Sequence, residues 1–206
     1  MIRVLLHYTP NWKEIANITI PVAKAYCKKH GYRFSAYDCI AYGQYDGKEK
    51  LNHILYEWKA GDICMVMDAD TMITNHGIKI EEFIDDSHDL YISKHVGNIN
   101  AGIFIIRLTE WSKRFLRYVL DNIGQEKIYC EQDAIAKYRR EHPHGSKIKI
   151  VEHPAFNSLK YELYPEHGIQ KEEDGQWVEG KSFVLHLPGI GQERRLAILK
   201  NTPVIL

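Results

Sequence analysis

The stretch "MVMDADTMI", Met65 to Ile73, ends a run of apolar residues with two aspartates that stand one residue apart. In an extended segment, residues i and i+2 point to the same side, so the carboxylates of Asp68 and Asp70 can lie close together and attract a cation. The alternative is a turn in which the aspartates cap the next segment, because aspartate is common in turns. The D-x-D-x-T pattern of aspartyl-phosphate phosphatases is excluded, because Met72 stands where that pattern needs threonine.

Strand and helix patterns alternate around this stretch. Apolar or alternating runs predict strands, and helical periodicity predicts helices, at residues 2–8 (strand), 21–31 (helix), 32–38 (strand), 48–61 (helix) and 62–68 (strand). Three strands that alternate with two helices predict a parallel sheet with crossover connections. Ligands of such sheets bind at the carboxyl ends of the strands, which is where Asp68 and Asp70 stand.

The second half of the chain has a less regular pattern. It predicts a short helix, two strands, two helices and two final strands, at residues 80–84, 89–94, 101–108, 109–123, 131–140, 147–152 and 182–187. A loop as long as residues 153–177 usually means function or mobility. We find no repeat or linker, so we expect residues 1–206 to form one α/β domain, with a mostly parallel central sheet flanked by helices.

Composition excludes several classes of function. The 206 residues are 45% hydrophobic, enough for a buried core, and the 27 basic and 27 acidic side chains indicate no nucleic-acid partner. The 4 cysteines lack C-x-x-C spacing, so neither a zinc site nor a disulfide framework is indicated. No apolar stretch suits a signal peptide or a membrane span, and we therefore expect a cytoplasmic chain, or a catalytic domain of a longer protein.

A histidine near the end of the chain is the second candidate. His186, in "FVLHLPG", ends the last apolar run, where a lone histidine is usually structural. If this final strand lies beside the end of the Asp68 strand, two carboxylates and an imidazole meet. That set suits Mn²⁺ better than Mg²⁺, which prefers all-oxygen coordination. Gly189, three residues later, would let the backbone approach an anionic ligand closely.

Two polar segments complete the candidates. Asn100, Ala101 and Gly102 precede a strand, where small residues permit close ligand contact, although a simple turn is the alternative. Glu131 and Gln132 begin a helix, where clustered polar and acidic residues usually do no more than favour the helix dipole. Neither segment is specific by itself.

These pieces, in this order, resemble the retaining glycosyltransferases of GT-A fold. The shared pattern is an apolar strand ending in D-A-D, then N-A-G-I-F-I-I-R-x-x-E-W-S, E-Q-D-A, F-N-S and H-x-P-G. It is most similar to glycosyltransferase family 34, which contains fungal α-galactosyl and α-mannosyltransferases and plant xyloglucan xylosyltransferases. Bacterial lipopolysaccharide galactosyl and glucosyltransferases of family 8 share it more distantly. The order, spread over nearly the whole chain, is more specific than any single motif.

The resemblance implies a metal site formed by the two ends of this pattern. Asp68 and Asp70 would bind Mn²⁺ together with His186, with Mg²⁺ as the alternative ion. The metal would bridge the diphosphate of a nucleotide sugar, and Ala69 and Gly189 would lie beside that donor.

The base and ribose of the donor have an expected position as well. In such enzymes they lie at the end of the first strand, which matches His7, Tyr8 and Thr9 in this sequence. Lys50, on the helix before the metal-binding strand, is a candidate for contact with the phosphate or the sugar.

The resemblance further implies how the donor sugar is held. Asn100, Ala101 and Gly102 would contact it. Gln132 would lie beside the anomeric carbon with Glu131 next to it, and these two are the expected catalytic residues. Retention through double displacement at a carboxylate and same-face transfer both remain open; we hypothesise same-face transfer.

The implied activity is metal-dependent, retaining transfer of a hexose or related sugar. The donor would be a nucleotide-diphosphate sugar, expected to be UDP-linked, and the acceptor a hydroxyl of a glycan or glycoconjugate. Many family members carry a lysine three residues after the H-x-x-G glycine, whereas this sequence has Gln192 there, with Arg194 and Arg195 as substitutes.

Two other functions are alternatives to sugar transfer. A degenerate domain that binds a nucleotide sugar without transferring it is the alternative, and Gln192 favours it. A nucleotidyltransferase is disfavoured, because the chain lacks an N-terminal glycine-rich phosphate loop with basic residues.

Overall fold

The computed structural model describes residues 1–39, 47–57, 59–95, 98–125, 128, 130–143, 147–151, 156–164 and 175–206. In this part of the chain, six strands form one sheet: β1 (Ile2–Tyr8), β2 (Arg33–Asp38), β3 (Ile63–Asp68), β5 (Leu90–His95), β6 (Asn98–Arg107) and β7 (Ile148–Val151). Their order across the sheet is β2-β1-β3-β6-β5-β7. Two further strands, β4 (Thr71–Ile73) and β8 (Val184–His186), form a separate pair.

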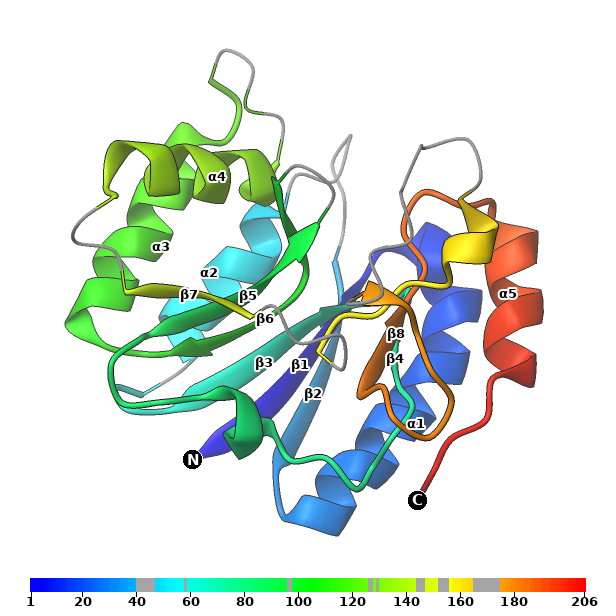
Figure 1. Cartoon of the computed structure of the whole chain (residues 1–206). Coiled ribbons are helices and arrows are strands. Elements are labelled where there is room, and N and C mark those ends of the chain that lie inside the picture. The colour runs from blue at the N-terminus through cyan, green and yellow to red at the C-terminus, as the bar shows by residue number, and fades with distance from the viewer. Residues whose placement is uncertain are drawn as a thin grey trace.

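Helices lie on both sides of the larger sheet (Figure 1). One side carries α2 (Lys48–Glu57), α3 (Glu110–Asn122) and α4 (Glu131–Glu141). The other side carries α1 (Lys13–His30), against which α5 (Gln192–Asn201) packs. Short 3-10 helices lie at η1 (Pro10–Trp12), η2 (Ile80–Phe83) and η3 (Tyr161–Leu163). None of the helices in the described residues combines the length and apolar composition needed to cross a bilayer.

The first half of the chain forms the predicted parallel unit. β1 pairs in parallel with β2 on one side and with β3 on the other, and α1 and α2 precede β2 and β3. The predicted start of the first helix was wrong: α1 begins at Lys13 rather than at residue 21, so that Pro21 lies inside the helix. The buried side chains of Ile15, Ala16 and Thr19 explain the difference, because tertiary packing outweighs the backbone hydrogen bond that a proline removes.

The second half adds antiparallel strands. β6 runs antiparallel to both β3 and β5, while β7 pairs in parallel with β5. The prediction of a mixed α/β fold with a mostly parallel central sheet is confirmed. The short β4 was not predicted, because three residues directly after the D-A-D motif carry no readable period.

Alternate side chains of the strands enter cores on the two faces of the sheet, and a third cluster, beside α1 and α5, includes Leu6 and Leu185. Leu5, Val66 and Phe104 join the core under α2, α3 and α4. Val4, Met65 and other residues of opposite parity join the core under α1, together with Phe156 and Phe183 from the C-terminal part. This period of two is what a sheet buried on both faces requires.

Most remaining predicted elements are present with shifted ends. The predicted strand at 101–108 begins at Asn98, and the final strand covers Val184–His186 rather than 182–187. The predicted helix at 48–61 ends at Glu57, and its residue 58 lies outside the described residues, as does residue 152 of the predicted strand at 147–152. Within the long loop at 153–177, the structure describes only 156–164 and 175–177.

Candidate functional site

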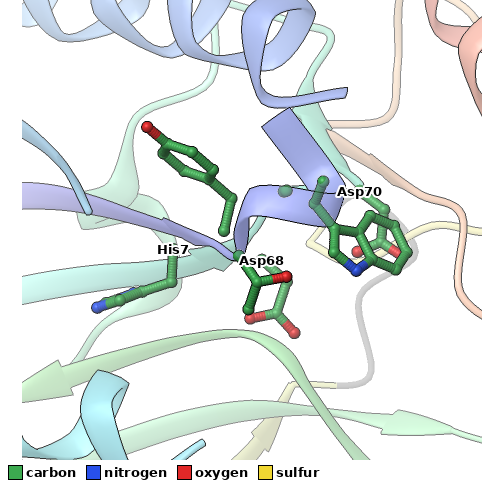
Figure 2. Close-up of a pocket in the computed structure, with 7 residues that line it drawn as sticks. His7, Asp68 and Asp70 are labelled. Carbon is green, nitrogen blue, oxygen red and sulfur yellow. The ribbon is translucent and has the colours of Figure 1, made fainter. Parts of the chain in front are cut away.

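A pocket lies where β1 and β3 end side by side. The parallel register sets His7 opposite Asp68, so residues 7–9 and 68–70, both predicted to bind the donor, lie next to each other. The cavity has a volume of about 160 Å³. Figure 2 shows its lining, which consists of His7, Tyr8, Thr9, Trp12, Asp68, Ala69 and Asp70. All but Trp12 were candidates from the sequence; an aromatic residue after a strand has no spacing that would have singled it out.

A fully buried lysine links Asp68 to Glu131. Lys50 has no exposed side-chain surface, and its Nζ lies 2.8 Å from Asp68 Oδ1 and 2.6 Å from Glu131 Oε1. The same Nζ donates to the carbonyl of Ala101 at 3.3 Å. These acceptors direct the ammonium group of Lys50 toward the protein, where it joins α2, β3, β6 and α4 at one point.

This cluster shifts the acidity of Asp68. Burial raises its pKa to about 6, with Lys50 acting in the opposite direction and the nearby carboxylates of Glu131 and Asp70 raising it further. The side chain keeps 30% of its surface accessible because it lines the pocket. Perturbed carboxylates inside a cavity are frequent at functional sites.

The side chain of Glu131 also lies close to the backbone of Gly47. Gly47 has φ 82°, a left-handed conformation, and a Cβ placed on it would come within 2.3 Å of Glu131 Oε2. A glycine is therefore needed here both for the backbone and for the space. The carboxylate of Glu131, which was expected to be catalytic, is thus closely packed and ion-paired with Lys50.

Asp70 belongs to a second group of residues, supplied by the end of the chain. The β4 and β8 pair sets Thr71 opposite His186, which brings His186 Nε2 to 3.5 Å from Asp70 Oδ1. Arg195 Nε, from α5, lies 3.3 Å from Asp70 Oδ2, and its guanidinium stands 4.4 Å from the ring of Trp12. The expected meeting was conditional on the final strand lying beside the Asp68 strand. In the structure β8 pairs with β4 instead, and this pairing brings His186 to Asp70.

The ring of His186 rests on Gly102. A Cβ on Gly102 would lie 2.4 Å from Cε1 of His186, so only glycine leaves room for the imidazole in this place. The other ring nitrogen, Nδ1, lies 3.0 Å from Asn157 Oδ1. Gly102 was expected to contact the donor sugar; the structure places the imidazole against it.

Three polar side chains hold this arrangement together. Asn157 Nδ2 donates to Ser93 Oγ at 2.7 Å and to Asn100 Oδ1 at 3.0 Å. Asn100 Oδ1 also accepts from the backbone N–H of Gly102 at 2.9 Å. The role of Asn157 was not predicted, because the F-N-S motif gives no clue to its distant partners.

Gln132 is bonded to the same part of β6. Its Oε1 accepts from the backbone N–H of Ala101 at 3.1 Å. The register between β5 and β6 shifts between Ile92 and Ser93, and Ala101 lies inside the shifted segment. Bulges of this kind are common beside active sites, and here the shift lets Ala101 bond to Gln132 and Lys50.

The side chain of His7 is packed against other aromatic rings of the protein. Its ring stacks against Tyr37 and His53, with centroids 5.6 and 5.5 Å away, and its Nε2 lies 3.2 Å from His53 Nδ1. Burial lowers the pKa of His7, and the charge of Lys50 lowers it further. His7 is therefore neutral near pH 7, and its Nδ1 has no hydrogen-bond partner among the described residues.

Gln192 and the two arginines that follow it have different surroundings. Gln192 Nε2 donates to the carbonyl of Asn11 at the surface, and Arg194 is exposed. Arg195 is 6% exposed and reaches Asp70. Gly189 lies in a turn with φ 71°, a conformation that favours glycine.

The described residues contain no cluster of three or more His, Cys, Asp or Glu side chains close enough to enclose a metal ion. Asp70 and His186 converge, whereas Asp68 Oδ1 is bonded to Lys50. The donor set of Asp70 and His186, an oxygen and a nitrogen supported by neighbouring polar groups, nevertheless has the chemistry that Mn²⁺ accepts.

Comparison with solved structures defines the class of this fold. A glycosyltransferase involved in the glycosylation of the major capsid of PBCV-1 matches with a TM-score of 0.72 at 15% identity, over 97% of this chain and 98% of that chain. The galactosyltransferase LgtC, in complex with donor and acceptor sugar analogs, matches with 0.61 at 13% identity, over 99% and 97%. The bifunctional glycosyltransferase WbbM matches with 0.69 at 10% identity, over 98% of this chain and 50% of that chain. The fold is that of the GT-A glycosyltransferases.

The sequence comparisons place the chain within a family. Residues 23–125, half of the 206, match the profile described as "Protein of unknown function, DUF273", and the chain belongs to that family. A probable alpha-1,6-mannosyltransferase, MNN10 of Saccharomyces cerevisiae, is 26% identical over 72% of this chain. The chain spans 50% of the length of that relative. The predicted resemblance to the group that contains fungal mannosyltransferases is confirmed.

Proposed function

We propose that this protein is a metal-dependent, retaining glycosyltransferase that moves a hexose from a nucleotide-diphosphate sugar to a hydroxyl of a glycan. The donor is UDP-linked in this proposal. The observation that carries it is the approach of His186 Nε2 to within 3.5 Å of Asp70 Oδ1, beside a pocket that both aspartates and the end of β1 line. The GT-A fold and the sequence similarity to a probable mannosyltransferase support the proposal.

The proposed donor orientation follows from the lining of the pocket. His7, Tyr8 and Thr9 border it on one side, where a base and ribose would lie, and Trp12 adds an aromatic surface. Asp68 and Asp70 border the other side, where the diphosphate would lie. Arg195 brings a positive charge to that side, which suits an anionic ligand.

The metal in this proposal is Mn²⁺, with Mg²⁺ as the alternative. Asp70 Oδ1 and His186 Nε2 would hold it, and Asp68 would contribute Oδ2, because its Oδ1 is bonded to Lys50. When bound, such an ion neutralises charge that grows on the diphosphate as the bond to the sugar breaks.

Same-face transfer is the proposed route to retention. Glu131 is within 2.6 Å of the Lys50 ammonium and packed against Gly47, so its carboxylate is a poor nucleophile. Gln132, bonded to Ala101, would lie at the sugar together with Asn100. The acceptor's proton would leave with a diphosphate oxygen, and Glu131 would act by its charge.

Thermal denaturation with a panel of UDP- and GDP-linked hexoses, with and without Mn²⁺, tests the proposal. A donor present at about 100 times its dissociation constant should stabilise the protein by about 2.7 kcal/mol. Release of free nucleoside diphosphate in the presence of an acceptor, and the anomeric form of the product, then test transfer and retention. Stabilisation without such release would favour the binding-only domain, and the absence of any Mn²⁺-dependent stabilisation would refute both.

A further inference from the structure

We propose that Asn157 is a positioning residue that fixes the ring of His186 as the Nδ1–H tautomer, so that Nε2 faces Asp70 without a proton and is ready to bind a divalent cation. The role in cation binding rests on the proposed function. The role in setting the tautomer rests only on the hydrogen bonds of the described residues.

The orientation of each amide follows from a backbone donor. The N–H of Gly102 lies 2.9 Å from a side-chain atom of Asn100, and a backbone N–H needs an acceptor, so that atom is the oxygen Oδ1. The atom of Asn157 that lies 3.0 Å from this oxygen must then be the donor Nδ2. Its second hydrogen goes to Ser93 Oγ at 2.7 Å.

The remaining atom of the Asn157 amide decides the state of the histidine. Because Nδ2 faces Asn100 and Ser93, Oδ1 faces His186 Nδ1 at 3.0 Å and can only accept. His186 Nδ1 must therefore carry the proton. In the neutral ring, Nε2 is then an acceptor with a lone pair.

This tautomer is the less favourable one for the nearest carboxylate. Nε2 lies 3.5 Å from Asp70 Oδ1, so two acceptors face each other across a gap. Asp70 alone would prefer a proton on Nε2, which it could accept as a hydrogen bond. Asn157 opposes that preference, and the gap between the two acceptors is where a cation is stabilised.

Close packing prevents the imidazole ring of His186 from rotating away from Asp70 and Asn157. His186 is 3% exposed, and its Cε1 and Nε2 edge lies on Gly102, where even a methyl group would clash. The backbone N–H of His186 also donates to Ser158, the residue after Asn157, at 2.8 Å. Asn157 and His186 therefore keep their relative position through both the backbone and the side chains.

The tautomer can be measured directly, without metal and without turnover. Long-range ¹H–¹⁵N spectra of protein labelled with ¹⁵N-histidine, recorded at alkaline pH where imidazole is neutral, distinguish Nδ1–H from Nε2–H. The His186 signals are identified by their absence in His186→Gln. We expect wild-type His186 to be Nδ1–H and Asn157→Leu to invert it to Nε2–H, bonded to Asp70.

Two further variants separate positioning from mere packing. Asn157→Asp keeps an acceptor for Nδ1–H but loses the donor to Asn100 Oδ1, so it should retain the wild-type tautomer while it lowers stability. A purely structural role would change the tautomer equally in Asn157→Asp and Asn157→Leu. Asn201→Leu, at an exposed asparagine on α5, is the matched control and should change nothing. Affinity for Mn²⁺ in the presence of nucleoside diphosphate, measured by electron paramagnetic resonance, should fall about 10- to 100-fold in Asn157→Leu and less in Asn157→Asp.

The outcomes distinguish this proposal from the function on which it partly rests. An Nε2–H ring in the wild type, or an unchanged tautomer in Asn157→Leu, would overturn the role of Asn157 whatever the activity. If the tautomer inverts as expected but wild-type protein binds no Mn²⁺ with any nucleotide, the proposed function and the cation-binding role fail together. The wild-type spectrum alone decides the tautomer if Asn157→Leu does not fold.

Discussion

Two lysine–aspartate pairs at opposite ends of the sheet have nearly the same geometry and opposite effects on acidity. Lys50 Nζ lies 2.8 Å from Asp68 at the carboxyl end of β3, and Lys149 Nζ lies 2.9 Å from Asp85, before β5 begins. The pKa of Asp68 is raised to about 6, whereas that of Asp85 is lowered well below its usual range. The accessible fractions of the two aspartate side chains, 30% and 34%, do not explain the difference.

The surroundings of the two carboxylates explain it. Protein encloses Asp68 at the pocket, and the carboxylates of Glu131 and Asp70 are close to it. At Asp85, hydrogen bonds from Lys149, His88 and the backbone N–H of Ser87 favour the charged form and outweigh desolvation. The comparison teaches that two ion pairs of nearly equal length can shift a carboxylate pKa in opposite directions, because desolvation and the neighbouring charges differ.

The largest expected effect is the loss of transfer in Asp70→Asn. The amide cannot supply the negative charge that faces His186, so turnover should fall about a thousandfold, as when a charge-stabilising group is removed from an active site. Asp85→Asn is the matched control and should keep wild-type turnover. Initial rates of nucleoside diphosphate release measure both, with circular dichroism as the check on folding. Equal rates in the two variants would remove the functional contrast between the pairs.

The next largest effect is on stability, in Lys50→Met. The substitution leaves Asp68 and Glu131 enclosed without their cation, so the free energy of unfolding should fall by about 3 kcal/mol. Lys149→Met, which breaks a solvent-exposed pair, should lower it by less than about 1 kcal/mol. Urea unfolding of the two variants measures the difference. Similar losses would show that enclosure does not separate the two pairs.

A smaller effect is expected for Glu131→Gln. Lys50 keeps Asp68 and the Ala101 carbonyl as acceptors, so the variant should fold and should lose roughly tenfold in rate, or about 1.4 kcal/mol. Its product should keep the wild-type anomeric form under same-face transfer. Mass spectrometry of the wild-type protein after reaction checks the alternative, because a glycosyl adduct on Glu131 would establish double displacement.

The smallest effect is the pH dependence of the exposed pair. A lowered folded pKa means that Asp85 stabilises the protein above its unfolded pKa of about 3.9, and that this contribution is lost as the pH falls through the folded pKa. The difference in unfolding free energy between wild type and Asp85→Asn should thus be under about 1 kcal/mol at pH 7 and shrink below about pH 4. A difference that grew on acidification would contradict the direction of the shift.

The approach of His186 to the aspartates was implied by the resemblance, but not the way in which it occurs. β8 pairs antiparallel with β4, so the carboxyl end of β8 meets the amino end of β4, next to Asp70. The choice between Arg194 and Arg195 could not be predicted, since neighbouring residues of one helix point in different directions and only packing shows which faces inward. Asn157 was quoted as part of a motif without a role, because its partners Ser93, Asn100 and His186 are far away in sequence.

The direction of β6 was open to prediction but was not predicted. The predicted strands at 89–94 and 101–108 leave six residues between them, too few for a crossover connection, so antiparallel pairing follows. The buried state of Lys50 had no comparable signal. A lysine on an amphipathic helix usually lies at the surface, and the carboxylates that hold it come from separate elements.

The clustering of Asp68 with Lys50, and of Asp70 with His186 and Arg195, has a consequence for how the site matures during synthesis. Lys50 and Asp68 are synthesised within the first third of the chain, whereas Glu131, the other carboxylate bonded to Lys50, follows later. His186 and Arg195 stand near the C-terminal end of this sequence, so the contacts that Asp70 makes with them can form only after most of the chain has been made.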